Sequence, residues 1–210
     1  MTGTERRRYD SLRRDAQARQ TRADISEAAR RLFVSQGWAA TTIRAVAQEA
    51  GVSVPTIYSA YGDKAGLTLA LAEAADLSAD SQQMLEELED DASDPRRQLA
   101  AMAGYDRRLF ERAGDLIALV REAGRTEAEL DAAYRAGRAK GDETRTQVFS
   151  SWPRDTLRED LTVPRAVDVY AAICNVDVYN TFILERGWSP DDVEEWWAEA
   201  LPRELLQNPG

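Results

Sequence analysis

The amino-acid sequence predicts an all-α protein in which a small N-terminal helix-turn-helix domain precedes a larger helical domain. Apolar residues recur at intervals of three and four over most of the 210 residues, as on one face of an α-helix. Glycine and proline separate these periodic segments, where helices end and begin. We expect three regions: a flexible arm at residues 1–20, a helix-turn-helix domain at 21–65 and a helical domain at 66–210. The two domains should together contain about nine helices.

The N-terminal segment, residues 1–20, is polar and contains six arginines but lacks a sustained apolar face. We therefore expect a mobile arm. Such an arm can reach a minor groove or phosphates, and a tail without a role fits the sequence equally well. Thr21 and Asp24 have the spacing of a capping box, and the apolar stripe that follows ends at Gly37. A first helix should span this stripe and pack over the next two helices.

Two short helices around a tight turn are predicted between Ile43 and Gly62. The first has a regular apolar face and ends at Gly51, which can adopt the left-handed backbone of a sharp turn. Ser53 is a favourable N-cap for the second helix, and Pro55 falls in its first turn, where a missing N–H costs no hydrogen bond. This order of residues is typical of a helix-turn-helix, although helices joined by glycine also occur in ordinary bundles.

The segment from Thr41 to Leu67, TTIRAVAQEAGVSVPTIYSAYGDKAGL, closely resembles the DNA-binding domain of the tetracycline-repressor (TetR) family, and the resemblance extends over Thr21–Leu71. The shared features are Thr-Ile-Arg opening a helix, Ala-Gly-Val at the turn, Pro-Thr-Ile-Tyr in the second helix, and a lysine three residues after an aromatic residue. The resemblance implies a DNA-binding fold. Many members have a histidine or another large polar residue where this chain has Ser59 and Ala60, so it does not predict the bases of the operator.

The outer face of the second helix should enter a DNA major groove, because its side chains are uncharged and several can form hydrogen bonds. Arg44 and Lys64 each lie at a helix N-terminus, where a cation is unfavourable unless an anion is bound. We expect Arg44 to contact a guanine or a phosphate, as matching arginines do in similar repressors, and Lys64 to contact a phosphate. The predicted DNA-binding residues are Thr42, Arg44, Ser53, Val54, Pro55, Thr56, Tyr58, Ser59 and Lys64.

Charge is divided unevenly along the chain. The whole chain has a net charge of −10, but residues 1–64 contain 11 Lys and Arg against 7 Asp and Glu. Residues 65–210 contain 16 basic against 30 acidic residues. A basic N-terminal part can approach phosphates while the acidic remainder stays away from them, although the acidic surface also fits ordinary solvation.

Composition excludes or disfavours several classes of site. The chain has no histidine and one cysteine, so an intrachain disulfide, histidine catalysis and the commonest zinc sites are excluded. An all-carboxylate metal site stays open, but we expect no metal, no cofactor and no enzymatic activity. Cys174 should be a core residue rather than a redox switch. No signal peptide is visible and no apolar run reaches the roughly 20 residues that span a bilayer, which predicts a cytoplasmic protein with no membrane partner.

Periodic segments predict six helices in the larger domain. A long helix starts beside the helix-turn-helix, and the following helix should break at Gly114, because glycine often ends a helix. The last two helices are the most apolar part of the chain. These helices are expected at residues 63–91, 95–113, 116–120, 126–152, 163–184 and 190–205.

The last two helices carry more apolar surface than a monomer of this size covers easily. We therefore expect them to form a homodimer, as they do in TetR-like proteins. The alternative is that the apolar stripe packs on the core of its own subunit. The residues expected at the dimer interface are Val169, Ile173, Val176, Val193, Trp196, Trp197, Ala200 and Leu201.

A small-molecule pocket is expected where aromatic and polar residues mix on helices that should face inward. Asp177 is the clearest candidate, because a carboxylate in so apolar a helix needs a partner, either a ligand or an arginine across the dimer. Ordinary packing is the alternative for each residue singly. The candidate residues are Tyr105, Phe110, Tyr134, Phe149, Trp152, Asn175, Asp177 and Tyr179.

Together with the resemblance, these features predict a sequence-specific transcriptional regulator. The expected form is a homodimeric repressor that binds a near-palindromic operator on double-stranded DNA and is released by an unknown small-molecule effector. An activator or a ligand-independent regulator of the same fold, and a protein-interaction module, are the alternatives.

Overall fold

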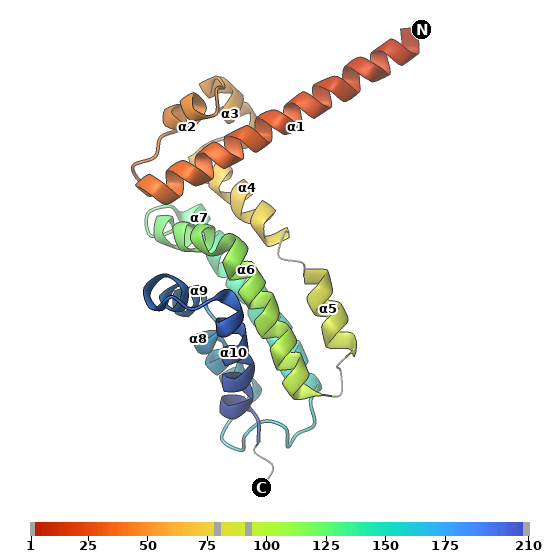
Figure 1. Cartoon of the computed structure of the whole chain (residues 1–210), viewed down its shortest axis with the longest axis vertical. Coiled ribbons are helices and arrows are strands. Elements are labelled where there is room, and N and C mark those ends of the chain that lie inside the picture. Colours follow the sequence, from red (N-terminus) through yellow and green to blue (C-terminus); the bar gives the residue numbers. More distant parts are fainter. Residues whose placement is uncertain (1–2, 78–80, 91–93, 208–210) are drawn as a thin grey trace.

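The computed structural model describes residues 3–77, 81–90 and 94–207, and the regular elements in these ranges are all helical. Figure 1 shows an elongated molecule with the N-terminal helices at one end and the C-terminus at the other. This confirms the predicted all-α architecture. The elements are α1 (Gly3–Gln36), α2 (Ile43–Glu49), α3 (Val54–Tyr61), α4 (Lys64–Leu77), α5 (Ser81–Asp90), α6 (Pro95–Ala123), α7 (Ala128–Ser151), α8 (Val163–Ile173), α9 (Val176–Asn180), the π-helical turn η1 (Thr181–Glu185) and α10 (Pro190–Leu205).

Helices α1–α3 form a three-helix unit, which we call the head. Its core contains Phe33 from α1, Val46 from α2 and Ile57 from α3, each at most 1% exposed. Leu67 of α4 and Leu116 of α6 belong to the same apolar cluster. The head therefore packs directly on the larger domain, and α4 and α6 are the helices that support it.

Helix α1 begins well before the predicted start. It runs without interruption from Gly3 through Thr21, and its N-terminal half projects beyond α2 and α3 (Figure 1). The predicted helix start at Thr21 was therefore wrong, and the segment expected to be a mobile arm at residues 1–20 is helical from Gly3 on, while its mobility stays a prediction. The segment has no proline and, after Gly3, no glycine, and it is rich in arginine, alanine and glutamine. A helix already fixed by packing extends through such residues at little cost.

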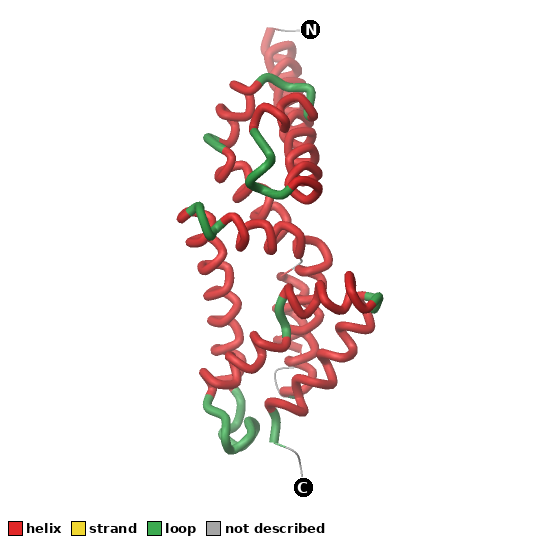
Figure 2. The backbone as a smooth tube through the Cα atoms, turned by 90° about the vertical axis from the view of Figure 1, so that its left-hand side faces the viewer, coloured by secondary structure: helices red, strands yellow, loops and turns green. Residues whose placement is uncertain are grey.

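Helix α6 is the central element of the larger domain and contacts α4, α5, α7, α9 and α10. Figure 2, turned by 90°, shows the head as a separate layer at one end of this bundle. The predicted break at Gly114 was wrong, because α6 continues to Ala123. A Cβ at Gly114 would lie 3.4 Å from a methyl group of Val176, so this glycine permits the close approach of α9.

The predicted helix at 163–184 is divided in the structure. Cys174 leaves the helical conformation with ψ of 87°, and Asn175 then caps α9 by accepting hydrogen bonds from the N–H groups of Asp177 (3.0 Å) and Val178 (3.1 Å). A side chain that bonds nearby backbone N–H groups favours a new helix start over continuation. The thiol of Cys174 is buried, and burial raises its pKa.

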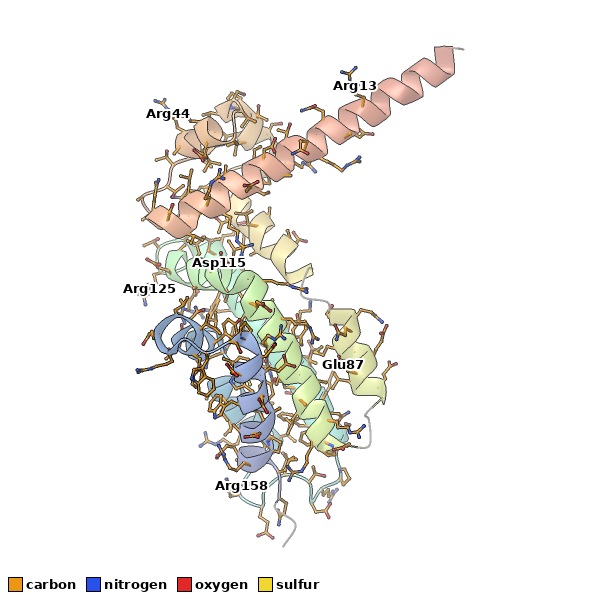
Figure 3. The ribbon with its side chains drawn as sticks, in the orientation of Figure 1. Arg13, Arg44, Glu87, Asp115, Arg125 and Arg158 are labelled. Atoms are coloured by element: carbon orange, nitrogen blue, oxygen red, sulfur yellow. The ribbon has the colours of Figure 1, made fainter. Side chains whose placement is uncertain are left out.

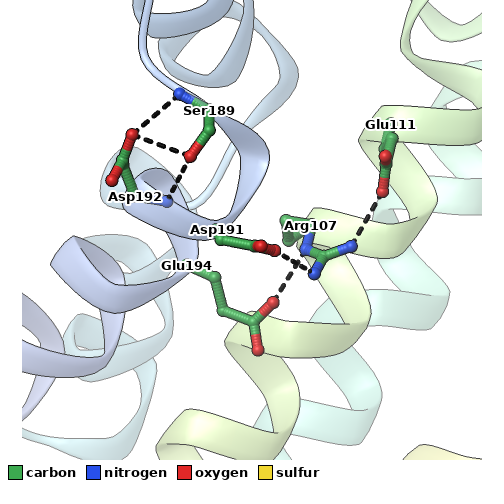
Figure 4. Close-up of polar contacts among 6 residues, drawn as sticks. All are labelled: Arg107, Glu111, Ser189, Asp191, Asp192 and Glu194. Atoms are coloured by element: carbon green, nitrogen blue, oxygen red, sulfur yellow. Dashed lines mark hydrogen bonds and ion pairs between the residues drawn. The ribbon is translucent and has the colours of Figure 1, made fainter.

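An ion-pair network attaches α10 to α6. The guanidinium of Arg107 donates to Glu194 (2.8 Å), Asp191 (2.7 Å) and Glu111 (2.8 Å), as Figure 4 shows. At the start of α10, Ser189 and Asp192 form a capping box. Within the described ranges, no helix has both the length and the apolar character needed to cross a bilayer.

Candidate nucleic-acid interface and internal cavity

The turn between α2 and α3 has the predicted geometry. Gly51 has φ of +66°, in the left-handed region that glycine adopts readily. The N–H of Val52 then donates to the carbonyl of Ala47 at 2.9 Å, which closes the C-terminus of α2. Thr42 caps α2 and Ser53 caps α3, each through its hydroxyl oxygen. The two helices are therefore set at a fixed angle by their own caps.

The outer face of α3 is exposed to solvent, and its inner face is buried in the core of the head. Ile57 is fully buried beneath the helix, whereas Tyr58 is 50% exposed and Pro55 and Ser59 are exposed. Val54 and Thr56 are half-buried, and Val54 packs against the core of the head. The hydroxyl groups of Ser53 and Thr56 lie 2.8 Å apart and share a hydrogen bond. A helix with this exposed face has the shape that major-groove contact requires.

Arg44 is exposed on the first turn of α2 and points away from the larger domain (Figure 3). The carboxylate of Glu49, at the other end of α2, is 2.8 Å from the guanidinium of Arg31 on α1. This pair neutralises the acidic residue of α2, so the exposed edge of the head keeps a positive side chain at Arg44.

Lys64 has protein partners that the sequence does not reveal. Its ammonium donates to the carbonyls of Trp38 (2.7 Å) and Thr41 (2.9 Å) and lies 3.7 Å from the centre of the Trp38 ring. Burial lowers the pKa of Lys64, while the charge of Glu127 raises it. An ammonium has three N–H donors, so one is left after these two bonds. Lys64 thus ties the α1–α2 loop to α4, and its predicted phosphate contact stays a prediction.

The other predicted DNA-binding residues lie together on the head. Thr42 and Arg44 belong to the start of α2, and the remainder follow the exposed edge of α3. On α1, Arg13 and Arg19 are exposed, whereas the side chains of Arg6, Arg7, Arg8 and Arg14 lie outside the described part of the structure.

The larger domain encloses a cavity of about 740 Å³, which lies within the size range of small-molecule sites. Its walls come from α4, α5, α6 and α7, with contributions from α8, α9 and Cys174 between them. Three of the predicted ligand-binding residues, Tyr105, Phe110 and Tyr134, line it. Exposed lining residues such as Glu73, Leu85 and Arg138 place its opening between the α4–α5 side and α7.

Five predicted ligand-binding residues do not line this cavity. The ring centres of Phe149 and Trp152 lie 4.7 Å apart, and both residues line a different pocket, of about 530 Å³, near the end of α7. The side chain of Asn175 caps the N-terminus of α9. Tyr179 packs against Phe110 and Trp197 in the core. Asp177 forms an ion pair with Arg121 of α6 in the same subunit, so neither a ligand nor an arginine of a second subunit is needed to explain it.

The cavity contains a polar cluster that the sequence analysis missed. Asp106 is 4% exposed, and one of its carboxylate oxygens accepts hydrogen bonds from the Tyr170 hydroxyl (3.0 Å) and from Arg145 (2.9 Å). Burial raises the pKa of Asp106, and Arg145 and Tyr170 oppose that shift. The sequence could have indicated this residue, because Asp106 is an acidic side chain on the otherwise apolar face of α6, between Met102 and Leu109.

Five predicted dimer contacts are buried in the core of their own subunit, each at most 4% exposed. They pack against α6, α8 and neighbouring core residues, so they cannot reach a second subunit, and this part of the prediction was wrong. Val169, Ile173 and Trp196 are half-buried and stay candidates. The five buried residues are Val176, Val193, Trp197, Ala200 and Leu201.

Two exposed apolar side chains lie at and just after η1. Leu184 is 77% exposed and Trp188 is 37% exposed. The ring of Trp188 lies 4.3 Å from that of Phe182, which in turn lies 5.0 Å from Trp196. Through Trp196, this aromatic group extends onto α10.

Comparison with known proteins agrees with the geometry of the head. Residues 25–78 match the family model described as bacterial regulatory proteins, tetR family. No curated protein matches the sequence.

Solved structures share the fold of the whole chain. NalD, the secondary repressor of the MexAB-OprM multidrug efflux pump in Pseudomonas aeruginosa, aligns with a TM-score of 0.75 at 23% identity, over 91% of this chain and 99% of that one. A Saccharomonospora viridis protein in complex with choline has a TM-score of 0.69 at 16% identity, over 89% and 98% of the two chains. The SmeT–triclosan complex has a TM-score of 0.67 at 18% identity, over 90% and 93%.

Proposed function

We propose that this chain, whose residues 25–78 match the family model of the TetR regulatory proteins, is a ligand-responsive transcriptional repressor that binds DNA sequence-specifically. It binds a near-palindromic operator as a homodimer, and a small molecule in the cavity of the larger domain releases it. The observation that carries the proposal is the exposed outer face of α3, with Tyr58 half exposed above a fully buried Ile57, at the end of an elongated molecule.

The position of the cavity supports a ligand response. Leu116 of α6 belongs to the core of the head and also lines the cavity, and α4 contributes both Leu67 to that core and Leu69 to the cavity wall. A ligand that fits the cavity better in one arrangement of α4 and α6 shifts the orientation of the head by its difference in affinity. The complexes of SmeT with triclosan and of the Saccharomonospora viridis protein with choline support small-molecule binding by this fold.

The apolar surface around Leu184, Trp188 and Trp196 supports dimerisation, because an exposed patch of this kind is typical of an interface. A two-fold dimer carries two heads, which meet half-sites roughly 34 Å apart on one face of the duplex.

Selection of bound sequences from random double-stranded DNA tests this function. The expected result is an enriched inverted repeat whose complex contains two chains, measured by light scattering of the purified complex. The variant Tyr58→Ala should lose enrichment while the helical content stays unchanged. Absence of any enriched sequence, or an enriched site without two-fold symmetry bound by one chain, contradicts the proposal.

A further inference from the structure

The positive charge of the N-terminal region lies mainly in residues 3–20 of α1, which we call the extension. The extension contains six arginines against three acidic residues. Residues 21–64 contain five basic residues against four acidic ones, so the packed part of the head is close to neutral. Neutralised phosphates supply most of the sequence-independent affinity of a protein for DNA. The extension is therefore the part of this region that is best able to supply it.

The arginines of α1 have different surroundings in its two halves. In the packed half, Arg30 and Arg31 each form an ion pair, with a carboxylate of α6 and of α2 respectively. In the extension, Arg13 and Arg19 are exposed, and neither has an ion-pair partner among the described residues. These two guanidinium groups can bind phosphates without breaking an ion pair inside the protein.

The extension starts beside the C-terminal end of α3 and continues past it. The Tyr61 hydroxyl donates to the carbonyl of Arg22 at 3.4 Å, which places the end of α3 against α1 directly after the extension. From there the extension runs for about 27 Å and reaches farther from the larger domain than α2 and α3 do (Figure 1 and Figure 2). Arg13, like Arg44, points away from the larger domain (Figure 3). A duplex on the exposed face of α3 therefore also meets the extension.

The dimensions of B-DNA decide which part of the duplex the extension contacts. An α-helix with its side chains is about 10–12 Å in diameter, whereas the minor groove is only about 6 Å wide. The major groove, about 12 Å wide, admits one helix, and in the proposed complex that helix is α3. The sugar-phosphate backbone beside the half-site is the surface that remains for the extension.

We infer that the extension contacts the phosphate backbone that flanks each half-site, and that Arg13 and Arg19 bind phosphates there. This inference rests on the proposed DNA binding and extends its surface beyond α2 and α3. The contacts add affinity without base preference, because phosphates carry no sequence information directly.

The variant Arg13→Gln/Arg19→Gln tests this contact in the full chain, by fluorescence anisotropy of a labelled operator. Two lost phosphate contacts should make the slope of log affinity against log salt shallower by about 1.8 for each chain, or about 3.6 for the dimer. Between about 50 and 200 mM salt, the unmodified chain should then lose about 150-fold more affinity than the variant. Base preference should stay unchanged. An unchanged slope overturns the inference, and so does a changed base preference.

Two further variants separate charge at this position from charge in general. Arg13→Lys/Arg19→Lys keeps both positive charges and should keep most of the original slope. Arg154→Gln/Arg158→Gln removes the same charge from exposed arginines at the opposite end of the molecule (Figure 3), and it should leave the slope unchanged. An equal loss of slope in this control would make the effect one of net charge and overturn the inference.

Hydroxyl-radical footprinting locates the contact on the duplex. The unmodified chain should protect backbone outside each half-site, and Arg13→Gln/Arg19→Gln should lose this outer protection while the half-sites stay protected. If both proteins give the same footprint on the operator, the inference is overturned and the proposed sequence-specific binding stands. If the chain selects no operator but binds random duplex with a slope that depends on Arg13 and Arg19, the phosphate contact stands and the proposed function fails.

An anionic membrane surface is the other partner that a basic helix could bind. The extension has only Tyr9 and Leu12 as large apolar residues, which is too few for the apolar face of a helix that lies in a membrane surface. We therefore expect no binding to phosphatidylglycerol vesicles. Vesicle binding that depends on Arg13 and Arg19, with DNA binding unchanged in the variant, would overturn the inference.

Discussion

Arg30 of α1 and Asp115 of α6 form a two-point ion pair between the head and the larger domain. The Nε of Arg30 lies 2.9 Å from one carboxylate oxygen and Nη2 lies 2.7 Å from the other. The same Nη2 donates to the backbone carbonyl of Arg112 at 2.7 Å. Asp115 directly precedes Leu116, a wall residue of the cavity. This contact fixes α1 on the part of α6 that also borders the cavity.

Replacing Arg30 with methionine should loosen the head without unfolding the larger domain. Both charged side chains are about one third or more exposed, so the loss of unfolding free energy should stay below about 1 kcal/mol. We expect amide hydrogen exchange to accelerate in α1–α3 and to stay unchanged in α10. Arg31→Met is the matched control, because Arg31 pairs with Glu49 inside the head. Equal effects of the two variants on the head would contradict this role of Arg30.

Arg44→Ala should reduce base preference at one position of each half-site. A bidentate arginine–guanine contact discriminates by roughly 1–3 kcal/mol, so the preferred base there should lose most of its advantage while other positions keep theirs. The measurement is a binding series over single-base variants of the selected operator. A uniform loss over all sequences would instead assign Arg44 to a phosphate.

Lys64→Ala should weaken binding to all DNA sequences alike. If the third N–H of the ammonium contacts a phosphate, the slope of log affinity against log salt should become shallower by about 0.9 for each chain, or about 1.8 for the dimer. The control is Thr68→Val, because the Thr68 hydroxyl accepts a 3.0 Å bond from Trp38 at the same joint but carries no charge. Thr68→Val should lower stability and leave the salt slope unchanged. If the salt dependence of DNA binding is unchanged in Lys64→Ala, Lys64 does not contact a phosphate and its role is structural.

Leu184→Glu should convert a dimer into monomers and leave the fold intact, because this side chain is 77% exposed in the subunit. Light scattering measures the mass, and circular dichroism checks the helices. Trp197→Ala should behave differently: its side chain is fully buried, so we expect a loss of about 3–5 kcal/mol in unfolding free energy. A Leu184→Glu protein that remains dimeric would place the interface elsewhere.

Asp177→Asn should have a small, pH-dependent effect on stability. A hydrogen bond from Arg121 lowers the pKa of Asp177 below its ordinary value of 3.8. The folded state therefore gains from the charged carboxylate above pH 3.8, and this gain is lost as the pH falls through the lowered pKa. Since Asp177 is 60% exposed, the variant should lose less than about 1 kcal/mol at pH 7. Denaturant unfolding at pH 7 and pH 3 measures it, and a cost that grows toward pH 3 would contradict the assignment.

The turn and caps of the head were predictable because they depend on neighbours in sequence. Gly51, Ser53 and Ile57 occupy positions whose roles follow from local backbone geometry and helical spacing, and the structure places them as expected. The extent of α1 was not predictable in this way. Helical continuation through residues 3–20 depends on the packed half of the helix beyond Thr21, and a capping motif inside a helix looks the same as one at its start.

The wrong predictions for the larger domain have a common cause. The spacing of apolar residues in the sequence shows that a helix has an apolar face, but it does not show which part of the protein covers that face. Trp197 and Val193 face α6 of their own subunit, and Gly114 faces α9 rather than ending a helix. Asp177 looked unpaired because its partner Arg121 lies 56 residues away. Asp106 and Arg145 were missed for the same reason, since 39 residues separate them. Pairings over such distances are set by tertiary packing.

The unbroken course of α6 has a further consequence. With 29 residues, the helix is a rod about 43 Å long, and along its length it carries the Arg107 ties to α10, one wall of the cavity and the Asp115 anchor of the head. A rigid rod cannot tilt at one end alone. Loosening the Arg107 salt links should therefore weaken the proposed coupling between the cavity and the head, even though Arg107 does not line the cavity.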